Sequence, residues 1–145
     1  MDKRGTAQMT RGERNHNPGN LEGSIHWLGV TGQDGPYAIF SDDASGLRAL
    51  AKNIRNQQRL HGLDTVAGII AKFAPPNENN TSAYVGAVCA YLGVDKDQEI
   101  SLENNGVLSR FVRAVILHEN GRCSYTDRDI DYAVAQLRRE DHAIS

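Results

Sequence analysis

Apolar residues recur at helical spacing through most of the chain after residue 43, and this pattern predicts a largely helical protein. Residues spaced i, i+3, i+4 and i+7 lie on one face of a helix and form one buried stripe. Gly62, Gly93 and Gly121 are expected to end three helices, Pro75 to end another, and Asp64 to cap the start of one. The five predicted helices contain the stripes Leu47–Ile54, Val66–Phe73, Tyr84–Leu92, Leu108–Ile116 and Ile130–Leu137.

The segment before these helices has no helical period and is rich in glycine, asparagine and aspartate. Ile25–Val30 and Tyr37–Ser41 are predicted as short strands, joined by turn residues at Gly32–Gly35 into a β-hairpin. Residues 1–10 are polar and are expected to be a flexible N-terminus. The predicted fold is therefore α+β and mostly α, with about five helices and one small hairpin, in a single domain over residues 1–145.

Composition narrows the class of protein. The chain has 145 residues, of which 39% are hydrophobic and 23% charged, and a net charge of −2. No apolar run approaches the ~18 residues of a membrane span, and no apolar stretch near the N-terminus indicates a Sec signal. The slight negative charge argues against nucleic acid as a partner, although Arg110, Arg113, Arg138 and Arg139 would be the candidate contacts. Two cysteines, Cys89 and Cys123, are too few for a disulfide framework, and the sequence cannot say whether they pair.

One acidic residue stands out at the end of the most apolar predicted helix. Glu119 continues the buried stripe that runs to Ile116, and it lies in the last turn, where the helix dipole is negative. Both burial and the dipole disfavour a charged carboxylate, and a protonated carboxyl is what a general acid needs. The alternative is a solvent-exposed glutamate, or one paired with Arg113 or Arg122. His118 lacks the second histidine of a zinc-binding H-E-x-x-H motif, so we expect neither a metal nor a cofactor.

Two polar loops contain further candidate residues. Residues 11–20 include Asn17 and Asn20, whose amides could bind sugar hydroxyl and acetamido groups or could simply shape the loop. Near Pro75, Glu78 and Asn79 could line a cleft or cap the following helix, and Tyr84 could face that cleft or pack in the core.

The same loops resemble a group of phage virion proteins associated with peptidoglycan-degrading, lysozyme-like proteins. Residues 11–21 (RGERNHNPGNL) resemble that group's R-G-x-R-N-N-N-P-G-N-I opening, and residues 74–84 (APPNENNTSAY) resemble a second motif. The match ends at Glu119–Gly121 and covers residues 11–121. His16 stands where the group often has asparagine, and Phe73 where it often has tryptophan.

A second resemblance is to soluble lytic transglycosylases. Val115–Gly121 (VILHENG) is similar to the end of their catalytic helix, I-x-x-V-E-S-G, and Thr81–Val85 (TSAYV) is similar to their later T-x-x-Y-V motif. In those enzymes the catalytic glutamate precedes the hairpin, whereas here its counterpart follows it. The order of motifs therefore implies a circularly permuted lysozyme-like domain.

The resemblance implies cleavage of the β-1,4 bond between N-acetylmuramic acid and N-acetylglucosamine, with Glu119 as the single catalytic acid and Asn17, Asn20, Glu78, Asn79 and Tyr84 binding the glycan. We favour a lytic transglycosylase over a muramidase, because a muramidase needs a second carboxylate and none stands out among Glu13, Glu22, Asp34, Asp42 and Glu78. The implied location is the virion, or the periplasm after delivery by a route other than Sec, with other virion or secretion-apparatus proteins as partners. The alternative is a non-enzymatic virion or tail protein that binds cell-wall glycan.

Overall fold

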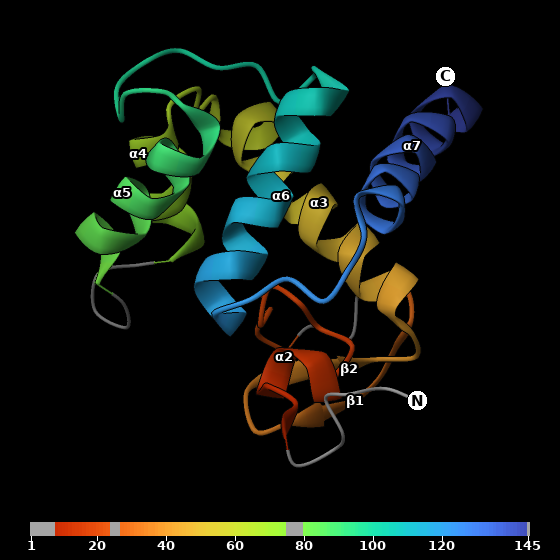
Figure 1. Cartoon of the computed structure of the whole chain (residues 1–145). Coiled ribbons are helices and arrows are strands. Elements are labelled where there is room, and N and C mark those ends of the chain that lie inside the picture. Colours follow the sequence, from red (N-terminus) through yellow and green to blue (C-terminus); the bar gives the residue numbers. More distant parts are fainter. Residues whose placement is uncertain (1–7, 24–26, 75–79, 145) are drawn as a thin grey trace.

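Five long helices form most of the computed structural model, in the places that the hydrophobic spacing predicts (Figure 1). The structure describes residues 8–23, 27–74 and 80–144. The short helix α2 (Arg11–Arg14) precedes a hairpin, so six helices and two strands lie within the described ranges, and a mostly α fold with one small hairpin is confirmed. The long helices are α3 (Asp43–His61), α4 (Val66–Phe73), α5 (Thr81–Leu92), α6 (Asn105–Asn120) and α7 (Asp127–Ile144).

The predicted helix ends are set by local backbone chemistry. Gly62, Gly93 and Gly121 each adopt the left-handed conformation, with φ of 66°, 72° and 74°, just after α3, α5 and α6. The predicted cap of α4 is wrong by one residue, because the side chain of Thr65, not Asp64, accepts the hydrogen bond from the Gly68 N–H.

The hairpin differs from the prediction in its first strand. β1 (Val30–Asp34) pairs antiparallel with β2 (Tyr37–Phe40), so the strand begins at Val30 where the predicted strand ends, and residues 24–26 lie outside the described residues. Gly35, at φ 58°, and Pro36 make the turn, which suits glycine at the first central position. β1 presents no alternating apolar face, so hydrophobic spacing carried no signal for it.

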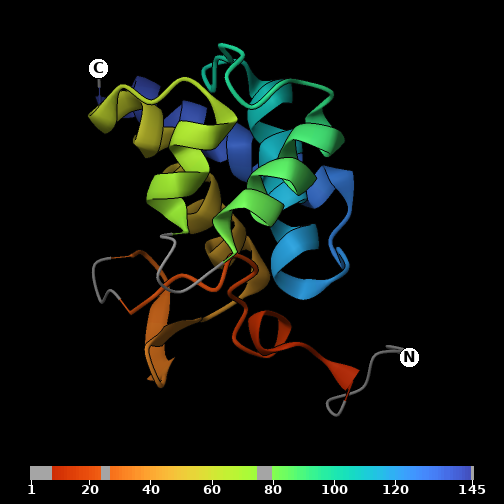
Figure 2. The same ribbon diagram turned by 90° about the vertical axis from the view of Figure 1, so that its left-hand side faces the viewer.

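The central helix of the core is α6, which packs against α3, α5 and α7. Its predicted stripe is buried in full: Leu108, Phe111, Val112, Val115 and Ile116. The two views of the ribbon agree that α2 and the hairpin lie beyond the C-terminal end of α6 (Figures 1 and 2). The fold therefore brings the end of the most apolar helix against the asparagine-rich N-terminal loop.

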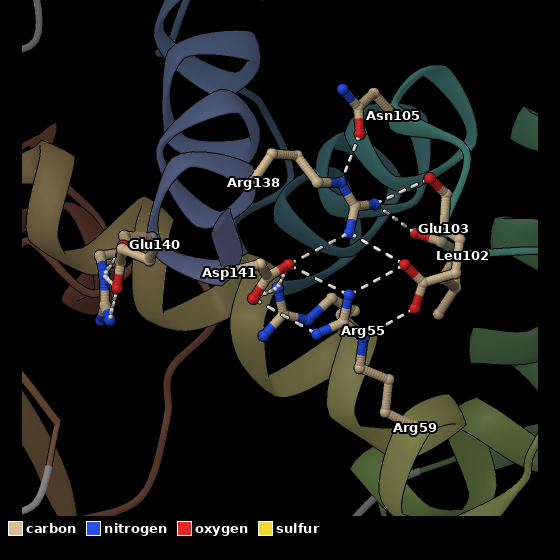
Figure 3. A network of polar contacts seen from close by, with 9 residues as sticks. Arg55, Arg59, Leu102, Glu103, Asn105, Arg138, Glu140 and Asp141 are labelled. Atoms are coloured by element: carbon tan, nitrogen blue, oxygen red, sulfur yellow. Dashed lines mark hydrogen bonds and ion pairs between the residues drawn. The ribbon is translucent and has the colours of Figure 1, made fainter. Parts of the chain in front are cut away.

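A network of ion pairs holds α7 against α3 (Figure 3). The Asp141 carboxylate forms ion pairs with the buried Arg55 and with Arg59, each with a nitrogen–oxygen distance of 3.1 Å. The Glu103 carboxylate forms ion pairs with Arg59 at 2.7 Å and with Arg138 at 3.1 Å. These guanidinium groups, Arg59 first, hold the pKa of Glu103 below its usual value. These ion pairs stabilise the packing of α7 on α3 and do not involve the loop that contacts Glu119.

Candidate functional site

Glu119 lies in the last turn of α6, half-buried, and lines a cavity of about 420 Å³. The two arginines that could have neutralised it bind elsewhere: Arg113 pairs with Asp127 at 2.5 Å and Arg122 with Glu13 at 2.6 Å. Within the described ranges Glu119 forms no ion pair. The Glu119 carboxyl group therefore faces the cavity without an ion-pair partner among the described residues.

Asn20 is the residue that the N-terminal loop brings to Glu119. Its Nδ2 donates to Glu119 Oε1 at 3.1 Å. The backbone of Asn20 is left-handed, with φ of 49°, a conformation that asparagine tolerates better than most residues. Its Oδ1 is buried and accepts no hydrogen bond from any described residue, so the amide contacts the Glu119 carboxyl group through its nitrogen alone.

Tyr84 approaches the same carboxyl group from α5. The side chain is fully buried, packed edge-on against Phe73 at 6.4 Å between ring centroids and stacked on His118 at 3.8 Å. Burial raises the pKa of the Tyr84 hydroxyl, and the negative charge of Glu119 beside it raises the pKa further. The hydroxyl has no hydrogen-bond partner of good geometry among the described side chains, so a protonated donor is held next to Glu119.

The loop that carries Asn20 is fastened to the end of α6 by Asn120. The Asn120 Nδ2 donates to the Pro18 carbonyl at 2.8 Å, and its Oδ1 accepts from the Thr10 hydroxyl at 2.6 Å. Gly12 is required at this contact, because a Cβ there would lie 2.6 Å from Asn120 Oδ1. Asn120 therefore positions the loop so that Asn20 lies beside Glu119.

The buried carboxylate of Glu13 joins α2 to the residues that follow α6. Its side chain is 1% exposed and accepts from Arg122 at 2.6 Å, from the Ser124 hydroxyl and from the Thr10 N–H. These donors, Arg122 first, lower the pKa of Glu13 to about 2. From the sequence, Glu13 is a candidate only for a second acid. The T-x-x-E spacing that begins at Thr10 is also typical of a capping box, and the structure contains one.

Three other residues predicted to bind the glycan are not found at the cavity within the described residues. Asn17 is fully buried, and its amide is used by the Leu21 backbone and the Ala38 carbonyl, so it shapes the loop and does not reach the cavity. This placement favours the scaffold alternative over the predicted glycan-binding role. Glu78 and Asn79 lie outside the described residues.

Of the five candidate second carboxylates, Glu22 is the one among the described residues that lines the cavity with Glu119. Glu13 is engaged as above, Asp34 accepts from the Asn15 amide at 3.1 Å, and Asp42 caps α3. Glu22 is exposed and lies where the loop bridges to Tyr37 of β2.

The opposite wall of the cavity comes from α3 and α4. Asn53 and Gln57 belong to α3, and Lys72 and Phe73 to the last turn of α4. The Gln57 amide donates to Asn53, while Gln57 Oε1 is buried and has no partner in the described part of the chain. Each wall of the cavity thus contains a side-chain amide whose buried oxygen has no partner among the described residues.

The described residues form neither a cluster of potential metal ligands nor a helix that could span a membrane. They contain no cluster of three or more histidine, cysteine, aspartate or glutamate side chains that could hold a metal ion. None of their helices is long and apolar enough to cross a membrane.

A bacteriophage protein is similar to this chain over most of its length. No protein-family model matches the chain. The sequence is 32% identical over 129 residues to protein P5 of Pseudoalteromonas phage PM2, an alignment that covers 85% of this chain and 79% of the relative. At that identity and coverage, the chain belongs to the family of the phage protein P5.

Proposed function

We propose that the protein cleaves the β-1,4 bond between N-acetylmuramic acid and N-acetylglucosamine in peptidoglycan, with Glu119 as the proton donor. The observation that carries the proposal is the setting of Glu119: half-buried at a cavity, without a cationic partner among the described residues, and held by the Asn20 amide. A general acid must lie within hydrogen-bond reach of the oxygen that it protonates, and a carboxyl group that lines a cavity can meet a glycosidic oxygen there.

In the favoured lytic transglycosylase reaction one carboxyl group is sufficient. Glu119 gives its proton to the glycosidic oxygen as the bond from the muramic C1 breaks, and N-acetylglucosamine leaves with its O4 hydroxyl. The muramic C6 hydroxyl then attacks C1 and returns its proton to Glu119, giving a 1,6-anhydro end. Tyr84, protonated and beside the carboxylate, can stabilise Glu119 while it is charged.

A hydrolytic muramidase is the second form of the proposal, and Glu22 is the observation that favours it. This carboxylate lines the same cavity and could activate a water molecule, as the base of an inverting glycosidase does. The two forms share Glu119 as the acid and differ in the product.

The resemblance of residues 11–121 to virion-associated wall-degrading proteins, and of Val115–Gly121 to the catalytic helix of lytic transglycosylases, supports the proposal. A permuted lysozyme-like domain would account for the order of these motifs. Membership in a phage protein family agrees with a virion-associated protein that reaches the wall during infection.

Mass spectrometry of peptidoglycan digested by the wild-type protein tests the proposal. A 1,6-anhydromuramic product is expected for a transglycosylase, and a reducing muramic end for a muramidase. Absence of either product overturns the proposed activity; sedimentation of the intact protein with walls would then support the non-enzymatic glycan-binding alternative.

A further inference from the structure

Lys72 is the cationic group at the candidate site. It is the single charged residue of α4 and lies in the last turn, where it lines the cavity together with Glu119 and Glu22. The side chain is exposed, and none of the ion pairs among the described residues includes it. Its ammonium group is therefore free to meet a ligand.

The charge balance of the cavity gives Lys72 a role that the amide groups cannot fill. The acidic residues lining the cavity, Glu22 and Glu119, offer no positive charge to an anionic ligand, even when Glu119 carries the proton that it donates. The chain carries a net charge of −2, so its overall field does not attract anions either. One ammonium group on the wall therefore determines whether a carboxylate is accepted.

The neutral groups of the cavity distinguish poorly between related glycans. The amides of Asn20, Asn53 and Gln57 line the cavity, and amide groups can bind the hydroxyl and acetamido groups that every N-acetylated amino sugar offers. A neutral chitin-type strand and a peptidoglycan strand differ instead in the carboxylates attached through O3 of each muramic unit. Amide N–H groups can also donate to a carboxylate, but among the described residues lining the cavity Lys72 is the one whose positive charge distinguishes a carboxylate from a neutral group.

We propose that Lys72 is a specificity-determining residue that binds the carboxylate of a muramic unit and selects anionic over neutral glycan strands. This inference rests on the proposed function, because it places a glycan in the cavity beside Glu119. The carboxylate has two sources, the lactyl ether of a strand without peptides and the peptide stem of a strand that carries them.

The test measures binding by calorimetry in a Glu119→Gln background, which prevents turnover. The ligands are peptide-free muramic-containing oligosaccharides, the same oligosaccharides with their peptides, and neutral chitotetraose. Lys72→Met is compared with Lys96→Met, a matched loss of charge at an exposed lysine that pairs with Asp97 and does not line this cavity.

Lys72→Met is expected to weaken binding of an anionic ligand about two- to fivefold, the range of a solvent-exposed ion pair, and to leave chitotetraose binding unchanged. Lys96→Met should change neither. The muramic ligand that loses affinity, with or without peptides, identifies the source of the carboxylate.

Equal affinities of Lys72→Met and its parent for every ligand, equal losses for neutral and anionic ligands, or no binding by the parent would each overturn the inference. The proposed function is judged separately. Lys72-dependent binding by a protein that releases no product would refute the proposed catalytic activity and leave the role of Lys72 standing. Product release with affinities unaffected by Lys72→Met would sink the specificity alone.

Discussion

Replacing Glu13 with glutamine tests how firmly the N-terminal loop is held against the end of α6. The pKa of this carboxyl group is about 2 in the folded protein, against 4.5 for an unperturbed glutamate. Since one pKa unit corresponds to about 1.4 kcal/mol, the ionised carboxylate stabilises the fold by about 3 kcal/mol. Its side chain is 1% exposed, so solvent screens the interaction little on the Glu13 side.

The sign of the pH dependence follows from the lowered pKa. Glu13 stabilises the fold fully at pH values above 4.5, and this contribution is lost as the pH falls toward 2, because the unfolded chain takes up the proton first. Urea denaturation should therefore show Glu13→Gln less stable than wild type by about 3 kcal/mol at pH 7 and by about 1.4 kcal/mol near pH 3.

Glu99→Gln is the matched control, because Glu99 is exposed and has the same charge. It should change the free energy of unfolding by less than about 0.5 kcal/mol at either pH. A Glu13→Gln variant within about 1 kcal/mol of wild type at pH 7, or a difference that does not shrink on acidification, would refute the reasoning.

Three further substitutions test other parts of the structure. Tyr84→Phe removes a buried hydroxyl without a described partner, so thermal unfolding should show equal or higher stability while muropeptide release falls; unchanged release would rule out a role for the hydroxyl. Asn20→Gly and Asn20→Ala both remove the donor to Glu119 and should lose similar activity. Only alanine is strained at φ 49°, by about 1 kcal/mol, so equal unfolding free energies of the two variants would contradict this reading of the backbone. Asp141→Asn leaves the buried Arg55 guanidinium without its counter-charge and should cost about 2 to 3 kcal/mol in urea denaturation; a loss below about 0.5 kcal/mol would mean that the network of Figure 3 contributes little.

The helices could be predicted from the sequence because each carries one apolar stripe and a local end signal. The burial of Val115 and Ile116 and the left-handed Gly121 follow directly from that pattern, and they place Glu119 at the end of the core helix. The first strand could not be found in the same way, because β1 is mostly exposed and is held by pairing with β2 rather than by an apolar face.

The site could be predicted only in part, because its contacts join residues about a hundred positions apart. Asn20 and Glu119 were both singled out from local composition, yet nothing local shows that their side chains meet. Asn17 has the same residue type in the same loop, but its backbone partners occupy the whole amide. The stack of His118 on Tyr84 likewise depends on how α5 packs on α6, which spacing within one helix does not reveal.

The central claim is that the Glu119 carboxyl group donates the proton that breaks the glycan strand. The most direct measurement is the initial rate of muropeptide release from purified peptidoglycan by wild type and by Glu119→Gln, compared at matched thermal stability. Loss of a general acid should lower that rate by about 10²- to 10⁴-fold, since an amide cannot give up a proton at neutral pH. A folded Glu119→Gln variant that releases muropeptides as fast as wild type would contradict the account.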